Sequence, residues 1–335
     1  MIKKYGKPFD KHKINRNTIT IEKMVEDCQN LIIATDILHT LENKCRICGS
    51  SELSHYITMG NKFDYYRCCN CRSLVMLELP EIRKIYDSNQ TNPVNHYVDE
   101  GLFHLRVEMI ANPKAEFVYN ILGNSSKNRK WLDIGCGTGE ILAAVANYGF
   151  DATGIEIDTR EIAFGLRHGL KIKSGFIAPE TMDKQTTDLI KDADVVSLFN
   201  VVEHMEEPYL VMQMIANTMK SGSYLVVEVP RTPSMADFVN LTFPNITHRH
   251  MCPPQHLQIL SEKGMKILFG DEFEIIATWG FGQGYTDILN AAAIVSKTYD
   301  SDIMMQLCGI SNEIQQVIDS NGLSDVMIYV ATKKA

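Results

Sequence analysis

The sequence WLDIGCGTGE, residues 131–140, decides the fold of the chain around it. It begins as an apolar run typical of a buried strand and continues into Gly135, Gly137 and Gly139. Glycines let the backbone turn tightly and approach a ligand closely, because they carry no Cβ atom. A helical pattern follows at 140–148. A strand, a glycine-rich turn and a helix in this order predict a ligand site at the edge of a parallel sheet.

The chain beyond this turn alternates between predicted strands and helices. Apolar runs typical of strands occur at 152–157, 195–201 and 223–229, and helical patterns at 160–168 and 208–220 lie between them. Another helix, two more strands and a helical insertion follow toward the end of the chain. This alternation predicts the α/β class, with a Rossmann-like, seven-stranded and mostly parallel sheet that carries helices on both faces.

Two acidic residues accompany the glycine-rich turn and indicate what it binds. Glu156 ends the next strand, 23 residues after Asp133, where a carboxylate can accept hydrogen bonds from the two hydroxyls of a ribose. Asp133 leads into the turn, where its charge would repel a pyrophosphate but suits a sulfonium compound that also carries an ammonium group. A turn needed only for packing is the alternative. The residues favour a cationic, ribose-containing cofactor.

Three stretches resemble a known family of enzymes. Residues 132–158 resemble motif I and the second-strand acid of class I S-adenosylmethionine-dependent methyltransferases, and residues 198–208 resemble their fourth-strand segment. Residues 228–233 and 248–269 resemble the subgroup that acts on sugars and other small hydroxylated metabolites. The resemblance covers about residues 95–335 and is most specific in motif I.

The resemblance implies a set of cofactor contacts. Asp133, Gly135 and Gly137 would line the methionine moiety of S-adenosylmethionine, and Glu156 would hold the ribose. Asn200 or Val201 would lie near the sulfonium and amino end. Tyr97 precedes the sheet, where related enzymes cover the cofactor, although a packing role is the alternative.

Histidines are the candidates for catalysis. Methyl transfer from a sulfonium needs an aligned nucleophile and a group that takes up its proton, and histidine can do this near neutral pH. His204 follows the fourth predicted strand, with a purely structural role as the alternative. His250 and His248 lie in a loop that the resemblance places against the acceptor. His256 is expected to be structural or supporting, and a metal site formed by these last three histidines is left open.

Four of the nine cysteines form two CxxC pairs and predict a metal site. The spacing of Cys45, Cys48, Cys68 and Cys71 matches a four-cysteine zinc ribbon, whose closed coordination shell points to a structural role for Zn²⁺. In the sugar methyltransferases that the sequence resembles, a similar module stands over the active site. This implies a contact with a nucleotide-linked or lipid-linked substrate.

The same patterns divide the chain into segments. We expect an N-terminal arm with helices (1–44), a zinc-ribbon-like module (45–80) and a helical connector that covers the cofactor (81–127). The methyltransferase domain then spans 128–335 and contains a substrate-facing insertion (231–256) and a helical insertion (286–320).

Composition excludes several other classes. The 335 residues are 45% hydrophobic and 22% charged, which is typical of a globular protein. The net charge of −8 disfavours nucleic acid as a partner. Residues 1–17 hold six basic residues and one acidic residue, and we expect this arm to be solvated, with a contact to phosphate or an anionic lipid surface as the alternative. No apolar run approaches the roughly 18 residues of a membrane span, so we expect a cytoplasmic protein.

Together these observations favour one activity over its rivals. The leading hypothesis is an S-adenosylmethionine-dependent methyltransferase that acts on a hydroxyl of a sugar or similar small metabolite, including nucleotide-linked ones, in the synthesis of capsule or another surface glycan. One alternative is an RNA methyltransferase that grips nucleic acid with its zinc ribbon, and another is a sugar C-methyltransferase. A zinc-dependent interaction module with an empty cofactor fold is disfavoured, because motif I is intact.

Overall fold

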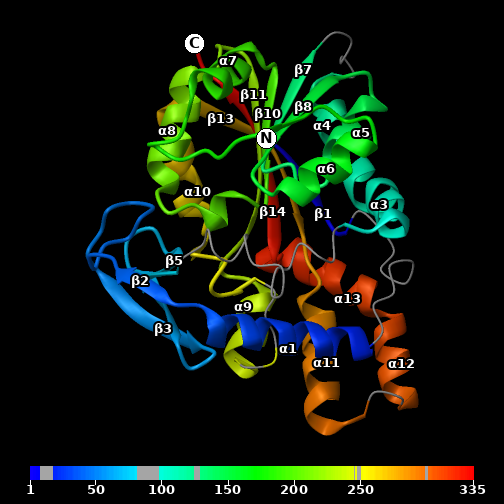
Figure 1. Ribbon diagram of the computed structural model, residues 1–335. Helices are drawn as coiled ribbons and strands as arrows, with labels where there is room; N and C mark the ends of the chain where they lie inside the picture. The colour runs from blue at the N-terminus through cyan, green and yellow to red at the C-terminus, as the bar shows by residue number, and fades with distance from the viewer. Residues whose placement is uncertain (8–17, 81–97, 124–128, 245, 247–249, 299–300) are drawn as a thin grey trace.

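An eight-stranded sheet forms the centre of the computed structural model, which describes residues 1–7, 18–80, 98–123, 129–244, 246, 250–298 and 301–335 (Figure 1). Along the sheet the strands follow the order β1-β13-β14-β11-β10-β7-β8-β9. Only β14 runs antiparallel to its neighbours in this sheet. The strands span Ile2–Tyr5 (β1), Lys130–Ile134 (β7), Asp151–Glu156 (β8), Ile172–Ser174 (β9), Val195–Phe199 (β10), Tyr224–Pro230 (β11), Phe273–Phe281 (β13) and Val326–Lys333 (β14). The Rossmann-like, mostly parallel α/β sheet is therefore confirmed.

The predicted count of seven strands is wrong, because the N-terminus adds an eighth. Strand β1 pairs in parallel with β13, and the Nζ atom of Lys4 lies 3.6 Å from the ring centroid of Trp279. The indole Nε1 of Trp279 donates a hydrogen bond of 2.8 Å to the carbonyl of Gly6. The first residues of the basic arm are thus held at the sheet edge, whereas the rest of the arm lies outside the described residues. Exposed lysines on an edge strand discourage further strand pairing.

Helices cover both faces of the sheet. On one face lie α4 (Asn112–Ile121), α5 (Glu140–Ala146) and α6 (Thr159–Arg167), and on the other lie α7 (Lys184–Asp192), α8 (Pro208–Thr218) and α10 (Glu262–Phe269) (Figure 1). Strand residues alternate between the two faces, as the pleat requires, so Trp131 packs with the first group and Leu132 with the second. Helix α3 (Glu100–Arg106) continues through the π-helix η3 (Val107–Ala111) into α4.

The four paired cysteines lie at or beside a second sheet that is joined to the large domain, with Cys68 at the end of one strand and the other three in or beside turns. Its order is β12-β5-β4-β3, and β12 comes from the chain far beyond the cysteines. The hairpin tip also holds α1 (Thr18–Ala34), because the Nζ atom of Lys62 donates to carbonyls in its last turn, at 3.1 Å to Ile32 and 3.3 Å to Ile33. The strands are β3 (Leu53–Met59), β4 (Phe63–Cys68), β5 (Leu74–Met76) and β12 (Gln258–Ile259), and a separate ribbon pairs β2 (Ile37–Thr40) with β6 (Glu78–Pro80).

A group of helices fills the chain between β13 and β14. They are α11 (Gly284–Ser296), α12 (Asp302–Gly309), α13 (Ser311–Ile318) and the π-helix η6 (Asp319–Leu323). The buried Asp325 joins them to α9 (Met235–Thr242), because its carboxylate accepts hydrogen bonds of 2.7 Å from the backbone N–H groups of Ala236, Gln283 and Gly284. Among the described residues no helix is both long and apolar enough to cross a membrane.

Candidate functional site

The glycine-rich turn leaves β7 at the carboxyl edge of the sheet. Gly135, Gly137 and Gly139 have φ angles of +67°, +55° and +92°, a region that favours glycine. A Cβ atom on Gly135 would also lie 2.6 Å from Cγ2 of Val201, so the turn and the chain after β10 are in close contact. The structure thus brings together Gly135 and Val201, two of the predicted cofactor-binding residues.

Glu156 is fixed beside this turn at the end of β8. Its Oε2 atom accepts a hydrogen bond of 2.9 Å from the N–H of Gly137, and its Oε1 atom accepts bonds of 2.7 and 3.0 Å from Ile157 and Asp158. The bond to Gly137 joins the predicted ribose-binding carboxylate to the predicted methionine-binding turn. Both therefore face the same place at the sheet edge.

Asp133 is the other predicted acidic ligand, and it lies under the turn. The side chain is 2% exposed, and Oδ1 accepts a hydrogen bond of 2.5 Å from the hydroxyl of Ser197. Burial raises the pKa of Asp133 to about 7; nearby Glu156 and Glu140 push it upward and the Ser197 hydroxyl pulls it downward. A cation placed against a buried carboxyl group of raised pKa stabilises its charged form.

A further carboxylate at this site was not predicted. Glu161 in the first turn of α6 is buried, and its Oε1 atom lies 3.7 Å from the point where a Cβ atom of Gly137 would be. Burial, followed by the charges of Glu156 and Asp158, raises the pKa of Glu161 to about 9. The sequence did not distinguish a ligand from a helix start at this position. An acidic residue at 158 with a glutamate three residues later is also the pattern of a helix N-cap. Asp158 does cap α6.

Asn200 sits at the end of β10 in a left-handed conformation, with φ +56°. Its backbone N–H donates to the carbonyl of Glu228 at 2.9 Å, and its Nδ2 donates to Oε1 of Glu228 at 3.1 Å. Glu228 is also paired with Lys114, whose Nζ atom lies 2.7 Å from Oε2, and both side chains are buried. Lys114 and Glu228 are 114 residues apart, and no sequence pattern indicated the pair.

His204 ends a short 3₁₀ turn, η4 (Val202–His204), directly after Asn200 and Val201, two of the predicted cofactor-binding residues. Its Nδ1 atom lies 2.9 Å from the carbonyl of Gln255, and since a carbonyl only accepts, Nδ1 carries the proton and Nε2 offers a lone pair. Burial lowers the pKa of His204 to about 4. The imidazole is therefore a neutral base at physiological pH.

His256 lies against His204, with the ring centroids 4.8 Å apart and the planes at 77°. Its Nδ1 donates to the carbonyl of His250 at 2.5 Å, and burial lowers its pKa well below the usual value. The fully buried carboxyl group of Glu203 lies near both rings, because one of its oxygens and one ring nitrogen of each histidine lie within 4.8 Å of one another. Burial raises the pKa of Glu203 well above its usual value, so the two imidazoles are the proton acceptors of this compact group.

The other predicted catalytic histidines have different outcomes. The side chain of His250 is buried, and its carbonyl holds the ring of His256. His250 belongs to none of the groups of potential metal ligands found among the described residues, so the alternative of a metal held with His256 gains no support. His248 and Tyr97 lie outside the described residues, and their roles stay predictions.

The four predicted metal ligands converge. All four sulfur atoms of Cys45, Cys48, Cys68 and Cys71 lie within 4.8 Å of one another, and the pairs Cys45–Cys71 and Cys48–Cys68 are 3.5 Å apart. Four Zn–S bonds of ~2.3 Å in a tetrahedron place neighbouring sulfurs roughly 3.8 Å apart, so the donor set fits zinc. The same separations are too long for disulfide bonds. Cys69 is exposed and lies outside this cluster.

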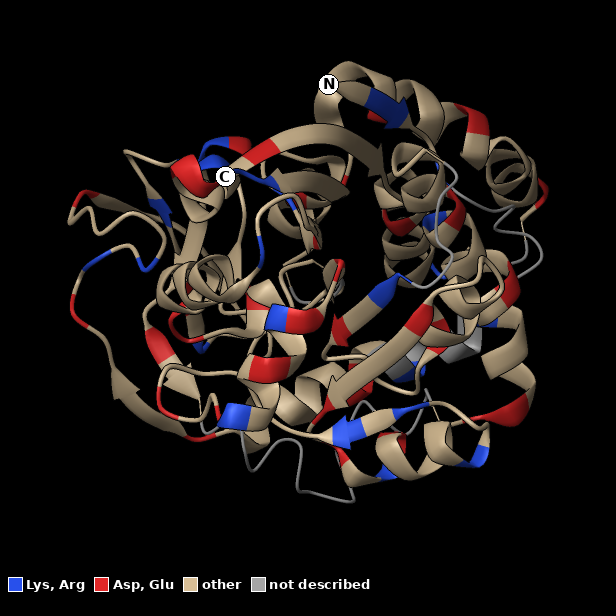
Figure 2. Ribbon diagram, turned by 90° about the horizontal axis from the view of Figure 1, so that it is seen from above, with Lys and Arg blue, Asp and Glu red and all other residues tan. Residues whose placement is uncertain are grey.

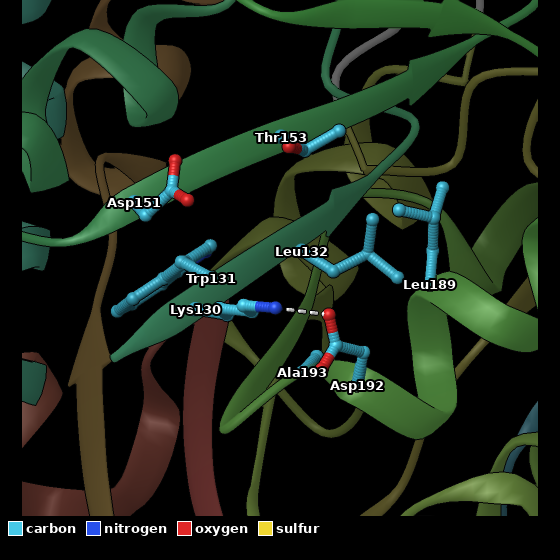
Figure 3. A pocket seen from close by; sticks show the side chains of 8 residues that line it. All are labelled: Lys130, Trp131, Leu132, Asp151, Thr153, Leu189, Asp192 and Ala193. Atoms are coloured by element: carbon cyan, nitrogen blue, oxygen red, sulfur yellow. Dashed lines mark hydrogen bonds and ion pairs between the residues drawn. The ribbon is translucent and has the colours of Figure 1, made fainter. Parts of the chain in front are cut away.

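A small cavity occurs elsewhere, at the amino-terminal ends of β7 and β8. It encloses about 160 Å³ and is lined by Trp131, Leu132 and Thr153 among others, with the ion pair of Lys130 and Asp192 beside it (Figure 3). Ligands of open α/β sheets bind at the opposite, carboxyl-terminal edge, and pockets for nucleoside-sized ligands are about 300 Å³ or more. This cavity is therefore not the cofactor site.

The fold and the glycine-rich site define the class of the S-adenosylmethionine-dependent methyltransferases. Residues 103–270, half of the chain, match the protein family described as a methyltransferase domain. The chain belongs to this family.

Similar proteins include ubiquinone biosynthesis O-methyltransferases. The one from Bordetella avium is 28% identical over 159 residues, which make up 44% of this chain and 65% of that protein. The one from Pectobacterium atrosepticum is 31% identical over 104 residues, or 29% of this chain and 41% of that protein. The chain thus covers less than two thirds of the length of these relatives.

Solved structures with a similar fold include phosphoethanolamine N-methyltransferase 2 of Haemonchus contortus in complex with S-adenosyl-L-methionine. It is 12% identical with a TM-score of 0.48, and the match covers 78% of this chain and 63% of that chain. A SAM-dependent methyltransferase from Archaeoglobus fulgidus is 17% identical with a TM-score of 0.43, over 70% of this chain and 100% of that chain.

Proposed function

We propose that this protein transfers the methyl group of S-adenosylmethionine to a hydroxyl of a sugar or similar small metabolite, with His204 as the general base. The observation that carries the proposal is the state of His204: a neutral imidazole with Nδ1–H fixed and Nε2 free to accept a proton. Its turn follows directly on Val201, which touches the glycine-rich turn. A base and a cofactor site therefore share one edge of the sheet.

The residues have distinct tasks in this reaction. S-adenosylmethionine supplies the methyl group as an electrophile with a good leaving group. Asp133 attracts the cationic end of the cofactor, Glu156 accepts from the ribose hydroxyls, and Asn200 contacts the amino end. His204 takes the hydroxyl proton on Nε2 while the new O–CH₃ bond forms and the S–CH₃ bond breaks. Alignment and proton removal are the whole contribution that the protein has to make.

The class of acceptor rests on three supports. The curated relatives are named as O-methyltransferases of a small molecule, and the segments 228–233 and 248–269 resemble enzymes that act on sugars. Lysine and arginine positions alternate with acidic positions along the described ribbon (Figure 2). With a net charge of −8, this disfavours RNA as the substrate. A sugar C-methyltransferase remains the second candidate, because the same imidazole would take the proton from an acidic C–H group of the acceptor.

Substitution of His204 tests the assignment of the base. We expect His204→Gln to lower kcat by about 100-fold or more, because proton transfer by a positioned base contributes 10²–10⁴-fold. Binding of S-adenosylmethionine, measured by calorimetry, should stay within about twofold of wild type. Activity is measured with sugar nucleotides and catechols as acceptors, and the methylated atom is identified by NMR of the product. The control is His55→Gln, since His55 is exposed on β3. Full turnover by His204→Gln would refute the histidine base.

We also propose that the four cysteines bind one structural Zn²⁺. A zinc ion with four thiolates carries two negative charges, and the guanidinium of Arg46 lies next to Cys45 in the chain and offsets part of that charge. Its Nη2 donates to the carbonyl of Met76, and its Nε and Nη1 atoms are buried without a hydrogen-bond partner among the described residues. A closed site of this kind stabilises the module and performs no chemistry of its own.

Adjacent cysteines provide a matched test of the metal site. We expect the wild type to contain about one zinc per chain by elemental analysis. Cys68→Ser should lose the metal and most of the cooperative unfolding transition of the module, because metal binding is a large part of the stability of such small sites. Cys69→Ser should keep both, since Cys69 is exposed and outside the cluster. A metal-free wild type that is fully folded would contradict the proposal.

The helical connector provides the last proposal about organisation. We propose that residues 81–127 cover the cofactor, as the resemblance implies. The support is the short ion pair, 2.6 Å long, between Nε of Arg106 on α3 and Oε1 of Glu140 at the start of α5. It ties the connector to the helix that follows the glycine-rich turn.

A further inference from the structure

The cysteine module, residues 45–80, is continuous with the chain segment that carries His256. Strand β12 pairs with β5 of the module in antiparallel register, with Gln258 opposite Val75 and Ile259 opposite Leu74. The N–H of Met76 extends this ladder by donating to the carbonyl of Leu257 at 2.9 Å. The module therefore sets the position of the residues that directly follow His256.

Tyr65 makes the most direct contact from the module to the proton-accepting group. It is completely buried on β4, and its hydroxyl donates a hydrogen bond of 2.6 Å to the carbonyl of His256. The ring of His256 packs edge to face on His204, and the preceding carbonyl, that of Gln255, holds Nδ1 of His204. A single hydroxyl of the module thus anchors the segment that orients both imidazoles.

Gln258 holds the turn of His204 from the other side. Its buried Nε2 donates to the carbonyl of Val202 at 2.6 Å and to that of Met205 at 3.0 Å, which brackets the turn η4. The neighbouring N–H of Leu257 donates to the carbonyl of Glu203 at 2.8 Å. Three hydrogen bonds from the β12 segment therefore fix the backbone on which His204 stands.

We infer that Tyr65 and Gln258 are positioning residues for His204, so that the cysteine module serves as a template for the proton-accepting group. The inference rests on the proposed role of His204 as the base. It extends that role, because it assigns to the module a task other than holding the metal or the substrate. A base displaced by about 1 Å loses up to about 100-fold in rate, so contacts that hold a turn and a ring in place are expected to act on kcat.

The test compares two neighbouring tyrosines in the full-length, metal-loaded protein. Tyr65→Phe removes only the hydroxyl that reaches His256, whereas Tyr66→Phe removes a hydroxyl from the adjacent, half-buried position on the same strand. We expect Tyr65→Phe to lower kcat by about 10-fold with the KM for S-adenosylmethionine within about twofold of wild type. Tyr66→Phe should change neither.

Ring ¹⁵N NMR provides a readout that general destabilisation does not move. In wild type the His204 ring should give the signals of a single Nδ1–H tautomer, with the resonances assigned by their loss in His204→Gln. In Tyr65→Phe the Nδ1 and Nε2 shifts should move toward the average of the two tautomers, and in Tyr66→Phe they should stay in place. Equal kcat values and equal ring spectra for the two variants would overturn the inference.

Gln258→Met tests the positioning of His204 independently, in case Tyr65→Phe does not fold. Methionine has a similar volume, and it also removes the Oε1 atom of Gln258, which has no hydrogen-bond partner among the described residues. The same loss of kcat and of the single tautomer is expected, and wild-type values would overturn the inference. A wild-type protein that binds no S-adenosylmethionine in calorimetry would instead refute the proposed function, so the two failures are distinguishable.

Discussion

Asp133→Asn is expected to weaken the binding of S-adenosylmethionine by about 100-fold, or about 2.7 kcal/mol. The carboxylate is buried under the glycine-rich turn, where a charge pair with the cationic end of the cofactor is poorly screened by water. Asparagine keeps the shape and one acceptor oxygen for Ser197 but removes the charge. Calorimetry measures the change. Asp151→Asn is the control, because Asp151 is exposed at the other end of the neighbouring strand and should leave the affinity unchanged.

The pH dependence of binding gives a second signature of Asp133. Its pKa is raised to about 7 by burial, so below pH 7 the free protein carries a neutral carboxyl that must lose its proton to pair with the cofactor. The affinity should therefore fall as the pH is lowered from 7 to 5.5, by up to about tenfold per pH unit. Above pH about 8 the amino group of the cofactor loses its own charge, so binding is strongest between about pH 7 and 8.

The variant should flatten the acidic limb of this profile. Asparagine does not titrate, so Asp133→Asn should bind weakly and almost equally at pH 5.5 and pH 7. A wild-type affinity that is constant from pH 5.5 to 8 would show that Asp133 does not meet a cation. An unchanged affinity of the variant at pH 7.5 would show the same independently of pH.

The parts of the fold that were predictable are those with local signals. The glycines at 135, 137 and 139 need positive φ angles, and the strands around them are apolar on both faces, so both features are visible in short windows of sequence. Strand β1 was not predictable in this way. Its lysines are typical of a solvated arm, and its pairing with β13 joins residues more than 270 positions apart.

The candidate site shows the same difference between residues with local sequence signals and contacts made by distant parts of the chain. Asp133, Glu156 and the four cysteines could be proposed from the sequence because their predicted chemistry requires a fixed spacing along the chain. The ring of His204 is oriented by the carbonyl of Gln255, and its turn is held by the amide of Gln258, and both contacts form only after the chain folds back over the turn. Burial then lowers the pKa of His204. This shift could not be predicted, because no short sequence pattern indicates that a loop residue is buried. Sequence spacing thus predicted candidate ligands, whereas the surroundings that shift their pKa values became visible only in the fold.

The largest loss of stability is expected at Lys114. Lys114→Met leaves the carboxylate of Glu228 buried without its counter-ion, and Nδ2 of Asn200 remains as a donor to its Oε1 atom. Removal of one member of a buried ion pair costs about 3–5 kcal/mol, and we expect a decrease of this size in the free energy of unfolding measured with urea at pH 7.5. Lys171→Met removes an exposed ion pair with Asp151 and should cost less than about 1 kcal/mol.

The double variant separates an unpaired charge from lost packing. Lys114→Met combined with Glu228→Gln has no buried charge at this position, so it should recover most of the stability that the single variant loses. A loss that persists in the double variant would indicate that Lys114 matters for packing alone. Recovery would show that the stability lost in Lys114→Met comes from the unpaired charge of Glu228, which accepts from Nδ2 of Asn200.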